Sequence, residues 1–424
     1  MTPHPLIAKT LAQSSSALET LALDIHATPE LGYAEHKAVA WQTRLLKRWG
    51  FQVQRPFASL ETAYRAAKGR GKPVVCFIAE YDALPEIGHA CGHNLICAAA
   101  LGAGRALAAA LAKEDRPGTV VVMGTPAEEG GGGKVRMIAR GAMKGLDMAI
   151  MAHPSANTQA WGGSTAIQSY EVSFAGQSAH AAGSPHEGRN ALDAVRLLFA
   201  GVDAWRQQLR ESSRVHGIVT DGGAAPNIIP DTASCHFFLR SPDDAVLAAM
   251  VRRFKAMATG AAMMTDTTAT VRARDGGYKA PWPNGPLNDA WVEAADALKL
   301  KPKAEAEPGR GSTDFSDVSQ VVPGSHVYFA ITRKKDLPSH APQFATAAAS
   351  AYGLTQMRRA AEALANVGYR FATDDEFRRD VREAFEAKRS PALTDRATIV
   401  AALTGLNDGR TRYRLGPTTR TSWC

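Results

Sequence analysis

The stretch that decides the fold of this chain is Glu80-Tyr81-Asp82-Ala83-Leu84-Pro85-Glu86-Ile87-Gly88-His89-Ala90-Cys91-Gly92-His93-Asn94-Leu95-Ile96. An apolar run over residues 74–78 precedes it, and an Ala-rich helical pattern over residues 97–112 follows it. The stretch therefore connects a strand to a helix, which is where ligands bind in open α/β sheets. Cys91 and His93 within it are both ligands for a borderline-soft ion such as zinc.

Cys91-Gly-His93 alone has less specific interpretations. A cysteine near a histidine is often only a buried thiol. A zinc finger requires a second Cys/His pair at short spacing, and none follows in the sequence. A Cys/His nucleophilic pair is a third interpretation. The choice among them depends on the rest of the chain.

Length and composition indicate a globular protein of two domains. The chain has 424 residues, of which 45% are hydrophobic and 21% charged. We expect no membrane segment, because no apolar run is long enough to span a bilayer, and no signal peptide over residues 1–16. The five cysteines are odd in number and scattered, so we expect reduced thiols and a cytoplasmic location.

The net charge of +8 is concentrated at the C-terminal end. Residues 388–424 contain seven basic and two acidic residues, so this tail accounts for +5 and the rest of the chain for +3. The sequence therefore does not predict a nucleic-acid-binding surface, and we expect the tail to be a solvated extension.

The order of the predicted elements suggests one domain inserted into another. Strands alternate with helices up to residue 165, which predicts a mostly parallel α/β sheet. From residue 166 the order βαββαβ follows within about a hundred residues, as in an α+β unit of ferredoxin-like kind. The predicted domains are residues 1–165 together with 281–387, an inserted domain of residues 166–280, and a basic tail of residues 388–424.

Ligand-type residues follow four of the predicted buried strands. They are Cys91 with His93, the pair Glu128-Glu129, His153, and His340. The C-terminal ends of neighbouring parallel strands lie within side-chain reach of one another. His153 could instead be a loop histidine, and the glutamates a solvated helix start. The coincidence of all four groups favours a site for two zinc-like ions about 4 Å apart, with one carboxylate left for acid/base work.

Eight ordered motifs carry a resemblance to a known family. They are Glu80-Tyr-Asp-Ala-Leu-Pro85, His89-Ala-Cys-Gly-His-Asn94, Gly124-Thr-Pro-Ala-Glu-Glu129, Met151-Ala-His-Pro154, Ser178-Ala-His-Ala181, Pro226-Asn-Ile-Ile-Pro-Asp231, Gly311-Ser-Thr-Asp-Phe315 and His340-Ala-Pro342. The chain resembles the aminoacylase/carboxypeptidase family of co-catalytic zinc metallopeptidases, peptidase family M20. Within that family it is similar to the Cys-Gly-His amidohydrolase branch, and there to the β-alanyl-lysine dipeptidase-like sub-branch.

The resemblance implies a role for each residue of the predicted metal site. Cys91 would bridge two divalent ions in each subunit, which we expect to be Zn²⁺, with Mn²⁺ or Co²⁺ as alternatives. His93 and His153 would complete one site, and Glu129 and His340 the other. Glu128 would be the general base, and Asp82 would orient the site.

The resemblance also implies a lid that binds substrate. The inserted domain would be a lid and dimerisation domain, and His180 would act on the active site of the partner subunit in a homodimer. Asn227 and Arg240 would bind the substrate's carboxylate and carbonyl oxygen. Arg310 precedes the Gly-Ser-Thr-Asp motif where the sub-branch has a small residue, and it is a further candidate for a carboxylate contact.

The function implied is that of a metal-dependent amidohydrolase or dipeptidase. Its substrates would be dipeptides or N-acyl amino acids with a free C-terminal carboxylate, and an aminobenzoyl-glutamate-type amidohydrolase is the alternative. A cysteine hydrolase using Cys91 would differ by surviving EDTA. A catalytically silent metal-binding protein is the alternative outside enzymes, and the intact Glu128-Glu129 pair argues against it.

Overall fold

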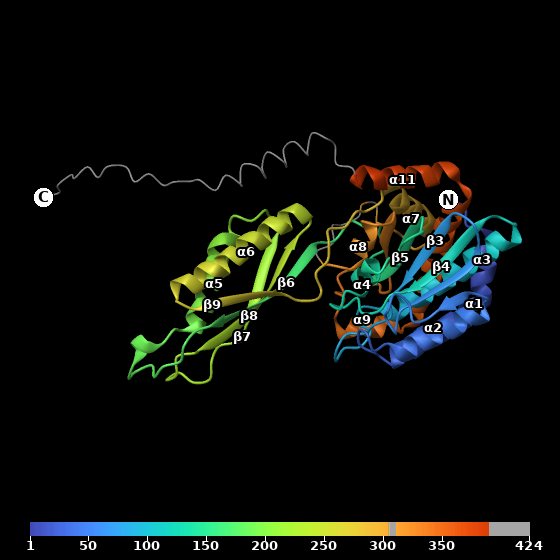
Figure 1. Ribbon diagram of the computed structural model, residues 1–424. Helices are drawn as coiled ribbons and strands as arrows, with labels where there is room; N and C mark the ends of the chain where they lie inside the picture. The colour runs from blue at the N-terminus through green and yellow to red at the C-terminus, as the bar shows by residue number, and fades with distance from the viewer. Residues whose placement is uncertain (304, 306–310, 390–424) are drawn as a thin grey trace.

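The computed structural model describes residues 1–303, 305 and 311–389. It has two lobes joined by two connections, with an α/β lobe built from both ends of the described chain and a smaller lobe built from its middle (Figure 1). Arg310 and the basic tail beyond residue 389 lie outside the described residues.

The elements alternate as expected in the larger lobe. Its strands are β1 (Gln52–Gln54), β2 (Tyr64–Arg70), β3 (Val74–Ala79), β4 (Gly118–Gly124), β5 (Met148–Ser155) and β10 (Gly324–Ala330). Its helices are α1 (Pro5–Ala27), α2 (His36–Arg48), α3 (His93–Lys113), α4 (Gly133–Ala139), α7 (Gly285–Ala297), α8 (Phe315–Ser319), α9 (Pro342–Ala348), α10 (Ala351–Thr373) and α11 (Asp375–Arg389).

These strands form one six-stranded sheet in the order β1-β2-β4-β3-β5-β10. The strands β4, β3, β5 and β10 are mutually parallel, while β1 and β2 are antiparallel additions at one edge. The parallel strands are nearly continuous apolar runs because helices cover both faces. All four parallel strands end at the same edge of the sheet, and that edge carries the candidate site.

Helix α3 is the central helix of the larger lobe. It packs between the sheet and the helices α1 and α10, and nearly every one of its residues is buried. Gly104 allows the close approach, since a Cβ there would lie 2.4 Å from Cγ2 of Val122. Although α3 is long and apolar enough to cross a membrane, 83% of its apolar window is buried inside the protein, as in a core helix.

The smaller lobe, called the lid below, is an antiparallel sheet covered by two helices. Its strands β6 (Ala166–Ala175), β7 (Arg214–Asp221), β8 (Thr232–Ser241) and β9 (Thr268–Ala273) pair in the order β7-β8-β6-β9. The helices α5 (Ala191–Arg206) and α6 (Asp244–Met264) pack on one face over a separate apolar core (Figure 1). The short helix η1 (Pro185–Glu187) lies in the loop after β6. A mostly parallel sheet with a separate α+β lobe confirms the predicted fold class.

Three details differ from the sequence prediction. Strand β5 continues to Ser155, because β10 pairs with it over its whole length, so His153 lies within the strand and not after it. The sequence pattern over residues 345–367 predicts one long helix, but the structure has two. Ser350 caps α10 by accepting a hydrogen bond from the backbone N–H of Gly353. The helices α8 and α11 were not predicted.

Candidate metal centre

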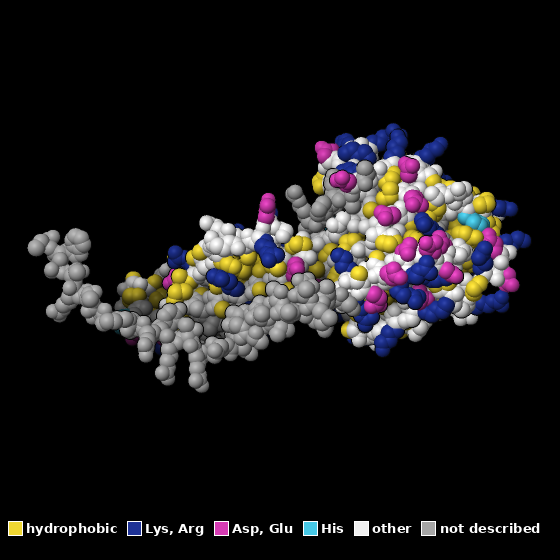
Figure 2. All heavy atoms as spheres, turned by 90° about the horizontal axis from the view of Figure 1, so that it is seen from above, with side chains coloured by type: hydrophobic (Ala, Val, Ile, Leu, Met, Phe, Trp, Pro, Cys, Tyr) yellow, Lys and Arg dark blue, Asp and Glu magenta, His cyan; other side chains and the backbone are white. Residues whose placement is uncertain are grey.

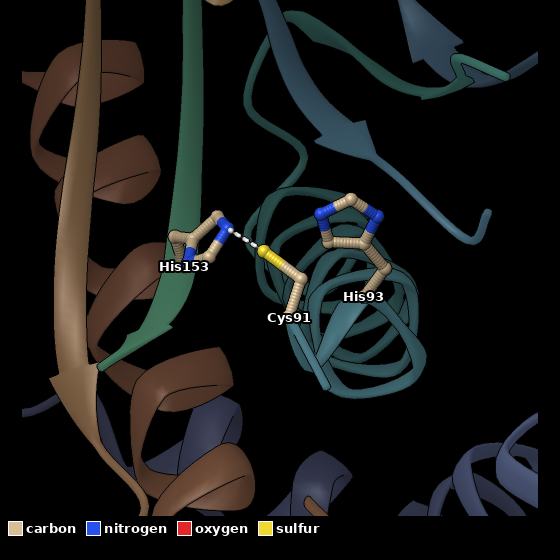
Figure 3. A group of neighbouring side chains, drawn as sticks. All are labelled: Cys91, His93 and His153. Atoms are coloured by element: carbon tan, nitrogen blue, oxygen red, sulfur yellow. Dashed lines mark hydrogen bonds between the residues drawn. The ribbon is translucent and has the colours of Figure 1, made fainter. Parts of the chain in front are cut away.

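A thiol and two imidazoles meet where α3 begins. Cys91 comes from the turn before α3 and His93 is the first residue of that helix, while His153 projects from β5. The sulfur lies between the two rings (Figure 3). The Sγ of Cys91 lies 3.4 Å from Nε2 of His153. Gly92 makes this approach possible, because its φ is +81° and a Cβ there would lie 2.8 Å from the Pro154 side chain.

A second group forms around the same thiol. Nε2 of His340 lies 3.4 Å from Oε1 of Glu129, and the ligand atoms of Cys91, Glu129 and His340 all lie within 4.8 Å of one another. The backbone N–H of His340 donates to the carbonyl of Ala90, which ties its loop to the cysteine turn. Cys91 therefore belongs to two groups, one with His93 and His153 and the other with Glu129 and His340.

Asp82 orients residues in both groups. Its Oδ1 lies 3.1 Å from Nδ1 of His93, and its Oδ2 accepts the backbone N–H of Glu129 at 2.9 Å. With Nδ1 of His93 occupied by Asp82, the Nε2 atom is directed toward the site. Burial opposes a charge on His93, but the neighbouring Cys91 and Asp82 raise its pKa well above the ordinary value.

The donors present fit a pair of soft divalent cations. The buried atoms Nε2 of His93 and Oε1 of Glu129 have no hydrogen-bond partner among the described residues, which is costly unless a ligand satisfies them. Thiolate, imidazole and carboxylate are the ligand types that zinc takes in proteins. Burial also raises the pKa of the Cys91 thiol, an effect that coordination to a cation would reverse.

Glu128 lies beside both groups and is 8% exposed. Burial and the nearby carboxylates of Glu80 and Glu129 raise its pKa well above the ordinary value. The carboxyl oxygen of Glu128 is also within 4.8 Å of ligand atoms of His93 and Glu129. It is therefore placed to exchange a proton or to bind a cation, and a mutational test separates these roles.

The site opens into a pocket of about 730 Å³ between the two lobes. The larger lobe contributes Cys91, Glu128, Glu129, His153 and His340 to its walls. The lid contributes Arg240, whose Nη1 donates to Oγ of Ser312 on the opposite lobe at 2.8 Å. Both lobes therefore surround anything that is bound next to Glu128.

The remaining sequence candidates lie elsewhere. His180 and Asn227 do not line this pocket, and they lie together because the backbone N–H of Ala181 donates to the carbonyl of Asn227. Their loops are at the end of the lid away from the larger lobe (Figure 1). Arg310 is outside the described residues.

Sequence reasoning missed several residues around the site. Lys134 forms a buried network with Glu80 and Asp314, and the Tyr278 hydroxyl donates to the backbone carbonyl of Glu128 at 2.8 Å. His326 and Tyr328 of β10 also line the pocket, beside His153. The only sequence signal was for β10, where a buried strand carries polar side chains at alternating positions.

Comparison with known proteins identifies a family and similar hydrolases. Residues 76–367 match the model of peptidase family M20/M25/M40. A Mus musculus protein named Xaa-Arg dipeptidase is 36% identical over 90% of this chain and 91% of its own length. An Escherichia coli K12 protein named as one of the subunits of p-aminobenzoyl-glutamate hydrolase is 36% identical over 62% of this chain and 58% of its own length.

A solved structure shares the fold. It is a Bacillus subtilis protein described as a dinuclear metal-binding peptidase from the M20 family, with a TM-score of 0.65 and 21% identity. The match covers 84% of this chain and 99% of that one. The chain belongs to peptidase family M20/M25/M40 and is a hydrolytic enzyme.

Proposed function

We propose that this enzyme is a metal-dependent dipeptidase that hydrolyses the amide bond next to a free C-terminal carboxylate. The observation that carries the proposal is the shared position of Cys91 in two ligand groups, with Glu128 beside them and Arg240 in the opposite wall of the same pocket. The dipeptidase and aminobenzoyl-glutamate relatives both have names that describe substrates with an amide bond to an amino acid.

Two divalent ions would be held by residues of this chain alone. Cys91 would be shared, with His93 and His153 on one ion and Glu129 and His340 on the other. The thiolate and the three imidazoles favour Zn²⁺, and Mn²⁺ and Co²⁺ are alternatives to be tested. When bound, these ions supply Lewis-acid activation of a water molecule and of the scissile carbonyl.

The residues of the chain perform the proton transfers and the positioning. Glu128, buried at the pocket floor, takes the proton of the attacking water and delivers it to the leaving amine. Asp82 keeps His93 and the backbone of Glu129 in place. Arg240 is half-buried in the lid wall, where its guanidinium suits capture of the substrate carboxylate.

We further propose that the enzyme works as a homodimer in the cytoplasm. His180 does not line the pocket of its own chain, so it would serve the active site of the partner subunit, with Asn227 beside it. The ring nitrogen Nδ1 of His180 accepts the backbone N–H groups of Ala182 and Gly183. Nε2 is therefore the ring nitrogen left to donate to a developing oxyanion.

The surface and the cysteines are consistent with a location in the cytoplasm. Acidic and basic side chains are intermixed over the larger lobe in the view of Figure 2, without a continuous basic area there. The described cysteines, Cys76, Cys91, Cys97 and Cys235, are all unpaired and buried. Free thiols persist in reducing compartments.

The dipeptide substrate is favoured over an aminobenzoyl-glutamate. The match to the dipeptidase spans nearly the whole of both chains, whereas the match to the aminobenzoyl-glutamate hydrolase protein covers 58% of that protein. The name of the dipeptidase relative adds a finer expectation, namely that the C-terminal residue of the substrate is basic.

The test is hydrolysis of a dipeptide panel by metal-stripped and reloaded enzyme. The panel contains Xaa-Arg, Xaa-Lys and Xaa-Glu dipeptides and p-aminobenzoyl-glutamate. We expect EDTA to abolish hydrolysis, added Zn²⁺, Mn²⁺ or Co²⁺ to restore it, and Xaa-Arg or Xaa-Lys to be cleaved fastest. Activity that survives chelation would instead support a thiol hydrolase using Cys91, and no hydrolysis of any member by fully loaded protein would overturn the proposal.

A further inference from the structure

The return connection from the lid contacts the backbone of the catalytic base. This connection, residues 274–280, leaves β9 and enters the larger lobe. The hydroxyl of Tyr278 donates to the carbonyl oxygen of Glu128 at 2.8 Å, and the phenol is buried. A second contact lies close by, because a Cβ at Gly276 would stand 3.0 Å from the carbonyl oxygen of Gly130.

Tyr278 is also paired with the edge of β6 in the lid sheet. Its backbone N–H donates to the carbonyl of Ile167, and its carbonyl accepts the N–H of Ile167, both at 2.9 Å. Ile167 in β6 pairs in turn with Arg240 in β8. Ile167 therefore lies between Arg240 and Tyr278, with one of them opposite it on each side of β6.

A continuous path thus leads from the lid arginine to the catalytic base. It runs from Arg240 to Ile167, its register partner on the neighbouring strand, and from Ile167 to Tyr278 through two backbone hydrogen bonds. It ends at the phenol on the Glu128 carbonyl. The other anchors of this loop come from the larger lobe. Glu35 accepts the N–H of Ala127, and Asp82 accepts the N–H of Glu129. Tyr278, which pairs with the lid strand β6, supplies a side-chain contact to the backbone of Glu128 itself.

We propose that Tyr278 is a positioning residue that makes the placement of Glu128 depend on carboxylate capture by Arg240. The inference rests on the proposed function, in which Arg240 binds the substrate carboxylate. A bound carboxylate fixes the lid sheet at Arg240, and the sheet holds Tyr278, so the base reaches its working position when the correct substrate is present. The carboxylate then contributes to kcat as well as to KM.

The test compares a good dipeptide substrate with its C-terminal amide. In the wild-type enzyme we expect amidation to raise KM and also to lower kcat about tenfold, within the range that a small misplacement of a catalytic group costs. In Tyr278→Phe we expect kcat for the free acid to fall to the kcat that wild type has for the amide. The ratio of the two KM values should stay as in wild type. Tyr278→Phe keeps both backbone hydrogen bonds to Ile167 and removes only the phenol oxygen.

Tyr33→Phe is the matched control. The Tyr33 hydroxyl donates to the carbonyl of Gly131 on the same loop at 2.6 Å, but Tyr33 belongs to the larger lobe and is not paired with a strand of the lid in the part of the chain that the structure describes. We expect this variant to keep the wild-type kcat ratio between acid and amide. If Tyr278→Phe also keeps that ratio, or if wild-type discriminates through KM alone, the linkage is wrong.

Two further results keep the inference separate from the proposed function. If wild-type enzyme cleaves acid and amide with equal kcat and KM, carboxylate recognition itself fails. If Tyr278→Phe does not fold, Gly276→Ala replaces it, because a Cβ at φ +87° and 3.0 Å from the Gly130 oxygen displaces the connection from the loop. Gly276→Ala should also cleave acid and amide with nearly equal kcat. Gly285→Ala, which has no atom within 4 Å of its added Cβ, should keep the wild-type difference in kcat.

Discussion

Lys134 and Glu80 form a fully buried ion pair, with Nζ 2.6 Å from a carboxylate oxygen. Lys134 comes from the first turn of α4 and Glu80 from the residue after β3. The same Nζ donates to Asp314 at 2.6 Å, and the backbone N–H of Lys134 donates to the other oxygen of that carboxylate. One cation therefore holds together three segments that surround the candidate metal centre.

Replacing this cation should destabilise the protein strongly. Lys134→Met leaves the carboxylates of Glu80 and Asp314 buried without their partner. Loss of one partner of a buried ion pair costs about 3–5 kcal/mol. We expect a loss of that size in the free energy of unfolding, measured by urea denaturation.

A surface pair provides the comparison. Lys72 bonds the Asp147 carboxylate at 3.0 Å, but its side chain is 63% exposed. Such pairs contribute about 0–1 kcal/mol, so Lys72→Met should have a small effect. Equal losses in Lys72→Met and Lys134→Met would show that the buried network is not what stabilises this region.

The adjacent glutamates should separate into a base and a ligand. Glu128→Gln is expected to keep its metal but to lose at least about a hundredfold in turnover, the usual scale for a general base. Glu129→Gln should lose metal, because the Glu129 carboxylate lies within 4.8 Å of the Cys91 and His340 ligand atoms. Elemental analysis and turnover are measured on both variants. Metal loss in Glu128→Gln with retention in Glu129→Gln would reverse the two assignments.

The sequence pointed to the candidate ligand residues that the structure brings together, but not to the residues that support them. Cys91, Glu129 and His340 could be found because polar residues follow buried parallel strands, and such strand ends converge. Lys134 could not be found, because a lysine after four glycines looks like a solvated loop residue, and its two carboxylate partners come from distant segments. Tyr278 is 150 residues from Glu128, and no periodic pattern reports a single phenol-to-backbone contact.

Glu35 should make stability depend on pH. Burial raises the pKa of this carboxyl from 4.5 to about 7, although its Oε1 accepts the N–H of Ala127 at 2.8 Å. Between pH 4.5 and about pH 7, Glu35 is protonated in the folded protein but has released its proton in the unfolded chain. The contribution of Glu35 to stability is therefore largest below pH 4.5, falls as the pH rises toward 7, and levels off above that.

Glu35→Gln tests this by removing the titration. From about pH 5 to pH 7, the unfolding free energy of wild type should fall relative to that of Glu35→Gln by about 1 kcal/mol per pH unit. Urea denaturation of both proteins in EDTA across this range measures it. Curves that stay parallel would show that Glu35 is ionised in the folded protein throughout.

His180 provides the test of a shared active site. Since His180 does not line the pocket of its own chain, His180→Ala should bind metal normally and yet be nearly inactive. The Glu128→Gln protein should also be inactive, for a different reason. In a mixed dimer, the site with an intact Glu128 comes from the His180→Ala protomer and receives His180 from the other. The second site of the same dimer lacks both groups.

Mixing the two inactive proteins should therefore restore activity. With free exchange of subunits, half of the dimers are mixed and each has one complete site, so about a quarter of wild-type turnover is expected. Two different affinity tags verify that mixed dimers form, and each variant alone supplies the baseline. If tagged mixed dimers form but turnover stays at that baseline, His180 does not act on the partner's site, and the lid loop that carries it needs another role.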